Sequence, residues 1–269
     1  MKEHVFAICA YQDSPYLEAC IRSLKMQTVP ADIILCTSTP SSYIEGLAES
    51  YEIPVFVRKG QSNIRDDWEF ACHMADARLV TIAHQDDMYH KTYKETLLSY
   101  ARKYPDMTMF TTDYVLVKEN DLAVRDKVRL VKKILRLPLR IPALNHITAV
   151  KRAALIFGNP ICCPSCTYNK ELIGSPVFDS GFQYALDWDT FDRLAKWEGR
   201  FICAERPLLY YRIHEANATK ACMKGDRRSR EEMEMFSRFW PEPIVKGIMH
   251  FYKRAYKEYN FLFLLPPDT

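Results

Sequence analysis

The sequence predicts an α/β fold with a mixed, mainly parallel sheet flanked by helices, because short apolar runs alternate with amphipathic helical segments. The expected strands are residues 5–10, 33–36, 55–57 and 79–82. Strands joined through helices pair in parallel, so a series of βα units is the most economical arrangement.

Two helical stripes separate these strands, and a third helical region is expected at the C-terminal end. Asp13-Ser14-Pro15 offers a cap and a proline suited to a first helical turn. The apolar residues that follow share one helical face: Leu17, Cys20, Ile21 and Leu24. The second face comprises Ile64, Trp68, Ala71, Cys72 and Ala75. Residues 236–265, rich in aromatic and basic side chains, predict a C-terminal helical extension.

The composition is that of a globular protein. The chain has 269 residues, of which 48% are hydrophobic and 26% charged. Nine cysteines, an odd and scattered number, and a charged start without a secretory signal argue against a disulfide scaffold. No apolar run approaches the roughly 18–20 residues that cross a bilayer. We therefore expect a cytoplasmic protein, held by peripheral contact if it meets the inner face of the cell membrane.

The basic residues are concentrated in one segment. Residues 124–142 hold seven Lys or Arg and one acid, while the rest of the chain holds 30 basic and 33 acidic residues. This distribution argues against nucleic acid as a partner. Val124, Val128, Val131 and Leu135 form a helical stripe among these cations, which is typical of a helix attracted to an anionic membrane. The alternative is a helix packed on the domain with a solvated basic face.

Two adjacent carboxylates, Asp86 and Asp87, follow the strand at 79–82, with His84 beside them. Ligands of parallel sheets bind outside the carboxyl ends of the strands, where this feature lies. Two neighbouring carboxylates repel each other unless a cation or hydrogen-bond donors compensate them, which favours a divalent metal site. The alternative is a turn that uses Asp for local backbone bonds.

Four segments in this order make a resemblance to glycosyltransferase family 2. They are AICAYQDSPYLEACIRSLKMQT, GQSNIRDDWEFACHMADARLVTIAHQDD, ALDWDTFDRLAKWEG and ERPLLYYRIHEANAT. The resemblance covers roughly residues 5–219. The resemblance implies the GT-A fold, a Rossmann-like sandwich, and transfer of a sugar from a nucleotide diphosphate with inversion. It further implies a domain at 1–220, with a nucleotide-sugar-binding half at 1–110 and an acceptor half at 111–220, followed by a helical segment at 221–269.

The resemblance assigns the metal to the HQDD element. Asp86 aligns with the metal-binding carboxylate of the family and Asp87 with its neighbour, whereas His84 replaces the usual first Asp. His214, in an element resembling the family's YRxH, is a possible additional ligand. These ligands suit Mn²⁺ or Mg²⁺, with Mn²⁺ preferred because it tolerates imidazole better.

The resemblance also assigns contacts to the nucleotide. Ala10 and Tyr11 align with nucleotide-contacting positions, Asn63 and Asp67 with a segment that closes over the base together with Trp68, and Arg212 with a diphosphate ligand. Thr37 and Ser38 stand where the family commonly has an acid that contacts the nucleotide base, so the hydroxyl of Thr37 or of Ser38 would replace a carboxylate there. For Tyr11 and Trp68 the alternative is core or rim packing, and Lys220 is a further candidate for closing over the phosphates.

Asp187 aligns with the catalytic base of the family. An acceptor hydroxyl is a poor nucleophile until its proton is removed, and a helix beginning near Asp187 is expected to keep that carboxylate ionised. Asp189 is the substitute candidate, and the alternative is that either residue only caps the helix. Cys163-Pro-Ser-Cys166 lacks the second pair that a zinc site needs, so buried or loop thiols are expected there.

The expected function is that of a hexosyl- or N-acetylhexosaminyltransferase. It would move a sugar from a UDP-sugar to a hydroxyl of a glycan or lipid-linked acceptor in cell-surface polysaccharide synthesis. The alternative is a non-catalytic nucleotide- or membrane-binding module that retains the GT-A scaffold, suggested by the departures at Thr37 and His84.

Overall fold

The structure is a computed structural model that describes residues 1–118, 121–123, 127–214 and 226–262, with side chains described outside 121–128 and 253–262. The described residues form one nine-stranded sheet in the order β3-β2-β1-β4-β8-β6-β9-β5, with β7 paired to β6. The strands are β1 (Lys2–Ala10), β2 (Asp32–Thr37), β3 (Val55–Val57), β4 (Ala77–His84), β5 (Met88–Tyr89), β6 (Met107–Lys118), β7 (Asp121–Ala123), β8 (Thr167–Asn169) and β9 (Arg200–Ile213).

The sheet is mixed and mainly parallel. β1 pairs in parallel with β2 and β4, β2 with β3, and β6 with β9, whereas β8 runs antiparallel between β4 and β6. The four strands expected from the apolar runs are β1, β2, β3 and β4. The predicted α/β fold with a mainly parallel sheet is confirmed.

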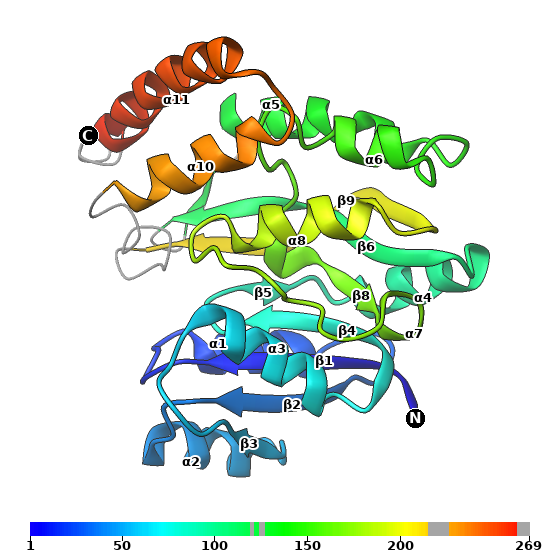
Figure 1. Ribbon diagram of the computed structural model, residues 1–269. Coiled ribbons are helices and arrows are strands. Elements are labelled where there is room, and N and C mark those ends of the chain that lie inside the picture. The colour runs from blue at the N-terminus through cyan, green and yellow to red at the C-terminus, as the bar shows by residue number, and fades with distance from the viewer. Residues whose placement is uncertain (119–120, 124–126, 215–225, 263–269) are drawn as a thin grey trace.

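Helices cover both faces of this sheet (Figure 1). The α-helices are α1 (Leu17–Lys25), α2 (Ser42–Ser50), α3 (Ile64–Met74), α4 (Tyr93–Lys103), α5 (Lys127–Leu135), α6 (Thr148–Ala153), α7 (Lys170–Ile173), α8 (Leu186–Ala195), α10 (Arg227–Ser237) and α11 (Glu242–Leu262). Two 3₁₀ turns, η1 (Leu137–Arg140) and η2 (Cys163–Ser165), complete the description. None of the described helices has both the length and the apolar character needed to cross a bilayer.

Alternation along the central strands produces a separate core on each face of the sheet. On β1, Phe6 and Ile8 pack with α1, α2 and α4, whereas Val5 and Ala7 face the core that contains α3, α8 and α10. α10 and α11 therefore lie on the same side of the sheet as α8. This arrangement brings residues far apart in the sequence to the start of α8.

The basic segment differs from the long helix expected over 124–142. It forms α5 and then the 3₁₀ turn η1, which has a proline near its start, as expected where proline interrupts an α-helix. Arg136 is fully buried and pairs with Asp113 of β6 at 2.9 Å, and Arg129 pairs with the same carboxylate at 3.1 Å. Part of the basic excess is therefore internal.

The exposed apolar face of this segment is also different from the expected stripe. The described side chains that project to solvent are Leu130, Val131, Ile134, Leu137 and Ile141, hereafter the α5 surface. Val131 belongs to both sets, Leu135 is half-buried, and the side chains of Val124 and Val128 lie outside the described residues. A helical phase set by the Arg136–Asp113 contact decides which face is exposed.

Candidate active site

The carboxyl ends of β1 and β4 are tied together by one glutamine. The Tyr11 N–H donates to Gln85 Oε1 and Gln85 Nε2 donates to the Tyr11 carbonyl, both at 2.9 Å. Gln12, which follows, has a φ of 53° and donates its N–H to Thr39 Oγ1 at 2.7 Å. Ala10 is buried at this edge, whereas the Tyr11 ring is half exposed, so the predicted contact residues lie at the rim formed by three loops.

Asp86 lies beside groups from two other parts of the chain. Its Oδ1 accepts a hydrogen bond from Ser14 Oγ at 2.8 Å, and its Oδ2 is 3.1 Å from His214 Nε2. The His214 ring packs against Tyr16 with centroids 4.8 Å apart. The structure thus brings together Asp86 and His214, the two residues assigned to the metal, from the ends of β4 and β9.

These two residues suit a divalent metal that takes its remaining ligands from a substrate. A carboxylate oxygen and an imidazole nitrogen are both ligands of Mn²⁺, and Asp86 alone also suits Mg²⁺. Within the part of the chain that the structure describes, no three His, Cys, Asp or Glu side chains converge as a metal site. A metal at Asp86 and His214 would therefore be only partly ligated by the protein.

Asp87 faces away from this pair. The residue is 2% exposed, and its Oδ1 accepts the Arg212 N–H at 2.8 Å. Burial raises the pKa of Asp87 well above its usual value, against the opposing effect of that N–H. Asp87 thus supports the site through the backbone of β9.

Arg212 is likewise packed under the site. Its guanidinium lies over the Tyr16 ring at 4.5 Å, and its Nε donates to the Asp86 carbonyl at 3.1 Å. The residue is 7% exposed. The positive charge of Arg212 therefore lies beneath Asp86, where it favours binding of an anionic group on the exposed side of Asp86.

His84 contributes a neutral imidazole with an unused nitrogen. Its Nε2 is buried and has no hydrogen-bond partner among the described residues. The ring packs against Trp68 with centroids 4.9 Å apart, and burial lowers the pKa of His84 to about 4. An orphaned polar atom is costly unless a ligand satisfies it, which makes His84 a suitable partner for a hydroxyl or phosphate.

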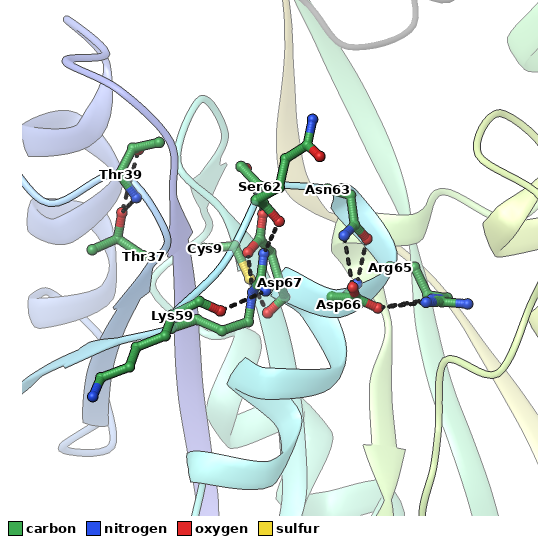
Figure 2. Close-up of polar contacts among 11 residues, drawn as sticks. Cys9, Thr37, Thr39, Lys59, Ser62, Asn63, Arg65, Asp66 and Asp67 are labelled. Carbon is green, nitrogen blue, oxygen red and sulfur yellow. Dashed lines mark hydrogen bonds and ion pairs between the residues drawn. The ribbon is translucent and has the colours of Figure 1, made fainter.

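The residues predicted to contact the nucleotide base are held by local hydrogen bonds and an ion pair, as Figure 2 shows. Asp67 accepts from Arg58 Nε at 2.7 Å and from Ser62 Oγ at 2.8 Å, and Asn63 caps α3 by accepting the Asp66 N–H at 2.9 Å. Thr37 Oγ1 accepts the Thr39 N–H at 3.0 Å. The bonds of Asp67 and Asn63 order the loop between β3 and α3, and the Thr37–Thr39 bond orders the turn that follows β2.

The second carboxylate, Asp187, lies in the first turn of α8. Its Oδ2 accepts from Asn159 Nδ2 and its Oδ1 from the Trp188 N–H, both at 2.8 Å. Burial raises the pKa of Asp187 to about 6, although the hydrogen bonds and the charge of Lys132 act in the opposite direction. The helix N-terminus therefore does not keep the pKa of this carboxyl low, because desolvation outweighs it.

Asp189 has a different environment, because it forms an ion pair with Arg238, the residue that follows α10. Asp187 accepts the N–H of the adjacent Trp188 but occupies the second position of α8, whose N-cap residue is Ala185. The pKa of Asp187, near neutrality, suits a base. Figure 1 shows that α8 begins on the side of the molecule to which β1, β2 and β9 run, left in the view.

The thiols near this helix are inert groups. Cys162, Cys163 and Cys166 are buried, and burial raises the pKa of each thiol. The described cysteines form no disulfide. Buried thiols were expected there. Lys220, a candidate for closing over the phosphates, and the C-terminal end of the 236–265 region lie outside the described residues.

Several site residues had no sequence assignment. Gln85 and Ser14 lie within motifs that predict roles for other residues, and Arg58 lies just before the segment that begins at Gly60. Proximity to these motifs is the signal that could have identified them. Asn159 and Lys132 reach Asp187 only through tertiary packing, and no local pattern marks them.

Residues 5–170 match the family model described as glycosyl transferase family 2. The chain belongs to glycosyl transferase family 2. A search of curated protein sequences found no match. The predicted resemblance is therefore confirmed, and the Asp86–His214 pair is a feature of a family 2 chain.

Solved structures share this family 2 fold at low sequence identity. TarS of S. aureus in complex with UDP-GlcNAc matches with a TM-score of 0.63 and 13% identity, over 93% of this chain and 70% of that one. Glucosyl-3-phosphoglycerate synthase of Mycobacterium tuberculosis in complex with UDP matches with a TM-score of 0.58 and 14% identity, over 88% and 80%. The same synthase with Mn²⁺ and UDP-glucose matches with a TM-score of 0.55 and 16% identity, over 82% and 76%. The GT-A fold is thereby confirmed.

Proposed function

We propose that this protein is an inverting, metal-dependent glycosyltransferase with a UDP-sugar donor. The observation that carries the proposal is the Asp86–His214 pair, 3.1 Å apart, in a chain of glycosyl transferase family 2. The donor sugar would be a hexose or an N-acetylhexosamine, and the acceptor a hydroxyl of a glycan or lipid-linked molecule in cell-surface polysaccharide synthesis. Complexes of the similar structures with UDP-GlcNAc and UDP-glucose support the choice of donor.

Asp86 and His214 would hold Mn²⁺, or Asp86 alone Mg²⁺, against the donor diphosphate. Such a cation stabilises the negative charge that develops on the leaving diphosphate. Arg212 adds positive charge from behind, and Asp87 holds its backbone in place. In this proposal the donor supplies the hydrogen-bond partner that the buried His84 Nε2 lacks among the described residues.

The nucleotide would lie along the rim between the ends of β1 and β2. Ala10, Tyr11 and Thr37 border it, and Asn63 and Asp67 shape the loop that borders its other side. In this proposal residues 1–110 bind the donor, residues 111–220 bind the acceptor, and the described helices α10 and α11 cover the acceptor side.

Asp187 would act as the base. It removes the proton from the acceptor hydroxyl while the hydroxyl oxygen attacks the anomeric carbon. The bond from that carbon to the diphosphate oxygen breaks, and UDP leaves with the electron pair. A pKa of about 6 leaves Asp187 ionised at neutral pH and a stronger base than an ordinary aspartate.

The α5 surface would contact an anionic membrane that presents the acceptor. Five exposed apolar side chains lie there, and the exposed Lys133 adds a cation. In this proposal the acceptor is carried by lipid, and the enzyme works at the inner face of the membrane.

UDP release from UDP-sugars with Mn²⁺ tests these assignments. Asp86→Ala and Asp187→Asn should each reduce turnover at least about 100-fold, because each removes a group that acts on the reacting bonds. Asp179→Asn, at an exposed position, is the matched control and should retain wild-type turnover.

The two variants should differ in donor binding. Calorimetry with UDP and Mn²⁺ should show weakened binding for Asp86→Ala and unchanged binding for Asp187→Asn. Wild-type turnover in both variants would remove both assignments. Metal-dependent UDP binding without turnover on any acceptor would favour the non-catalytic module instead.

A further inference from the structure

A carboxylate of α10 binds the chain that leads into α8. Glu231 accepts hydrogen bonds from the N–H groups of Gln183, Tyr184 and Ala185 at 3.1, 2.7 and 2.9 Å. These three residues directly precede α8, and Asp187 is the second residue of that helix. One side chain, 44 residues away from Asp187 in the sequence, thus holds three consecutive backbone groups beside the proposed base.

The start of α8 lacks a cap of its own. Ala185 occupies the N-cap position and has no side-chain oxygen that could accept a backbone N–H. Without Glu231, the N–H groups of the preceding turn would have no acceptor among these contacts. Backbone donors bound to a charged carboxylate make stronger hydrogen bonds than donors bound to neutral acceptors, so the contact is an effective anchor.

Other contacts of α10, and of Arg238 directly after it, fix the same end of α8. Arg228 lies over the Tyr184 ring at 5.0 Å, Arg238 pairs with Asp189, and Phe236 packs edge-to-face on Trp188 with centroids 4.9 Å apart. In Figure 1, α10 lies above and to the left of α8. Tyr184, Trp188 and Asp189 flank Asp187, so α10 determines where the backbone of the base lies.

We propose that Glu231 is a positioning residue that orients Asp187 through the backbone of residues 183–185. The inference rests on the proposed function, because it takes Asp187 as the base. Glu231 itself does not touch the reacting groups. It sets the direction in which the first turn of α8 presents the Asp187 carboxylate, while Asn159 holds one oxygen of that carboxylate.

Three variants separate this role from simple support of the fold. Glu231→Gln keeps the shape and loses the charge, and Glu231→Ala loses every acceptor. Glu234→Gln, at an exposed position on the same helix, is the matched control. Amide hydrogen exchange of residues 183–185 in the full chain reports on the contact without any need for turnover, and should accelerate in the Glu231 variants alone.

Kinetics then test the positioning role. Glu231→Ala should reduce kcat about 10- to 100-fold, the order expected when a catalytic group is displaced by about 1 Å. KM for the donor and calorimetric binding of UDP with Mn²⁺ should stay at wild-type values, because the donor side is not touched. In an Asp187→Asn background, Glu231→Ala should cause no further loss of turnover, since the group that it positions is already absent.

Each contrary outcome is distinguishable. Wild-type kcat in Glu231→Ala, or a full additional loss of turnover in the Asp187→Asn background, would overturn the positioning role while leaving the proposed function intact. Unchanged exchange at residues 183–185 would overturn the contact itself. Absence of turnover by the wild-type protein with every UDP-sugar would overturn the proposed function and, with it, the catalytic part of this inference.

Discussion

The neighbouring carboxylates Asp86 and Asp87 have different environments although they follow the same strand. Asp86 is next to Ser14 and His214, at the surface of the site, whereas Asp87 is buried under it on the Arg212 N–H. Burial raises the pKa of Asp87. The repulsion between the two adjacent carboxylates is thus reduced, because Asp86 faces outward and Asp87 faces inward.

Asp187 shows how burial adjusts a single residue for base chemistry. Its pKa of about 6 compares with a usual value of 3.8, because desolvation penalises the charged form. The folded protein therefore binds this proton more tightly than the unfolded chain does. Stability gained by that proton is present below about pH 4 and is lost as the pH rises through about 6.

Asp187→Asn should accordingly stabilise the protein in a pH-dependent way. At pH 8 the variant should unfold with a free energy about 1–3 kcal/mol higher than the wild type, because it removes a desolvated charge. At pH 4 the difference should nearly vanish, since wild-type Asp187 is then protonated. Urea unfolding at the two pH values measures this difference.

The exposed Asp179→Asn variant serves as the control and should show the same small difference at both pH values. An Asp187→Asn effect that is equal at pH 8 and pH 4 would show that the folded-state pKa is not raised. The pH dependence of kcat gives a second reading, because turnover should fall below about pH 6 as the base is protonated.

At the scale of elements, Asp113 of β6 anchors α5 to the sheet. Its carboxylate receives Arg136 at 2.9 Å and Arg129 at 3.1 Å, and Arg136 also donates to the Thr112 carbonyl at 3.1 Å. Burial raises the pKa of Asp113, but the hydrogen bond from Arg129 and the charge of Arg136 outweigh burial and lower it. The ion pair thus fixes the helical phase that exposes the α5 surface.

Asp113→Ala should therefore be strongly destabilising, because it leaves the fully buried Arg136 charge without its partner. We expect a loss of about 3–5 kcal/mol in the free energy of unfolding, measured by urea titration at pH 7. The contribution should disappear in acid, as the pH falls through the lowered folded-state pKa of Asp113.

Asp106→Ala is the matched control, since Asp106 pairs with Arg200 at 2.9 Å on the surface. Its loss should be below about 1 kcal/mol. Equal losses in the two variants would mean that the buried Asp113 ion pairs contribute no more to the free energy of unfolding than the exposed Asp106 pair does.

At the scale of the whole molecule, the sheet separates a core on the α1, α2 and α4 face from one on the α3, α8 and α10 face. The proposed donor and acceptor sites both lie where the strands end. The α5 surface lies on the second side of the sheet, in the outer layer with α6 and α11 at the top of Figure 1. A membrane bound there would face the acceptor half of the chain.

Ile134→Glu tests this orientation, because the Ile134 side chain is 55% exposed and can change without disturbing a core. Binding to vesicles containing anionic lipid should fall about tenfold or more, since burial of an isoleucine side chain contributes about 2 kcal/mol. Co-sedimentation with the vesicles measures the bound fraction.

Leu172→Glu places the same change on α7, where Leu172 is also exposed, and should leave vesicle binding unaltered. Equal binding by the Ile134→Glu variant and the wild type would exclude the α5 surface as the membrane contact. Loss of binding in both variants would point to a general effect of added negative charge instead.

The sequence by itself determined the elements of the donor half and the place of its acidic motif. The runs at 5–10, 33–36, 55–57 and 79–82 became β1 to β4, because short apolar runs and helical periodicity are local properties. The position of Asp86 at a strand end followed from the same pattern. The helix at residues 42–50 and the split of the basic segment were not predicted.

Only the tertiary structure decided how the site residues are used. It set Asp86 against His214, turned Asp87 inward, left His84 neutral, raised the pKa of Asp187 and bound Glu231 to the start of α8. Each of these outcomes depends on burial or on contacts between residues distant in the chain. Desolvation and long-range hydrogen bonding are properties of the packed molecule, which no local pattern of residues encodes.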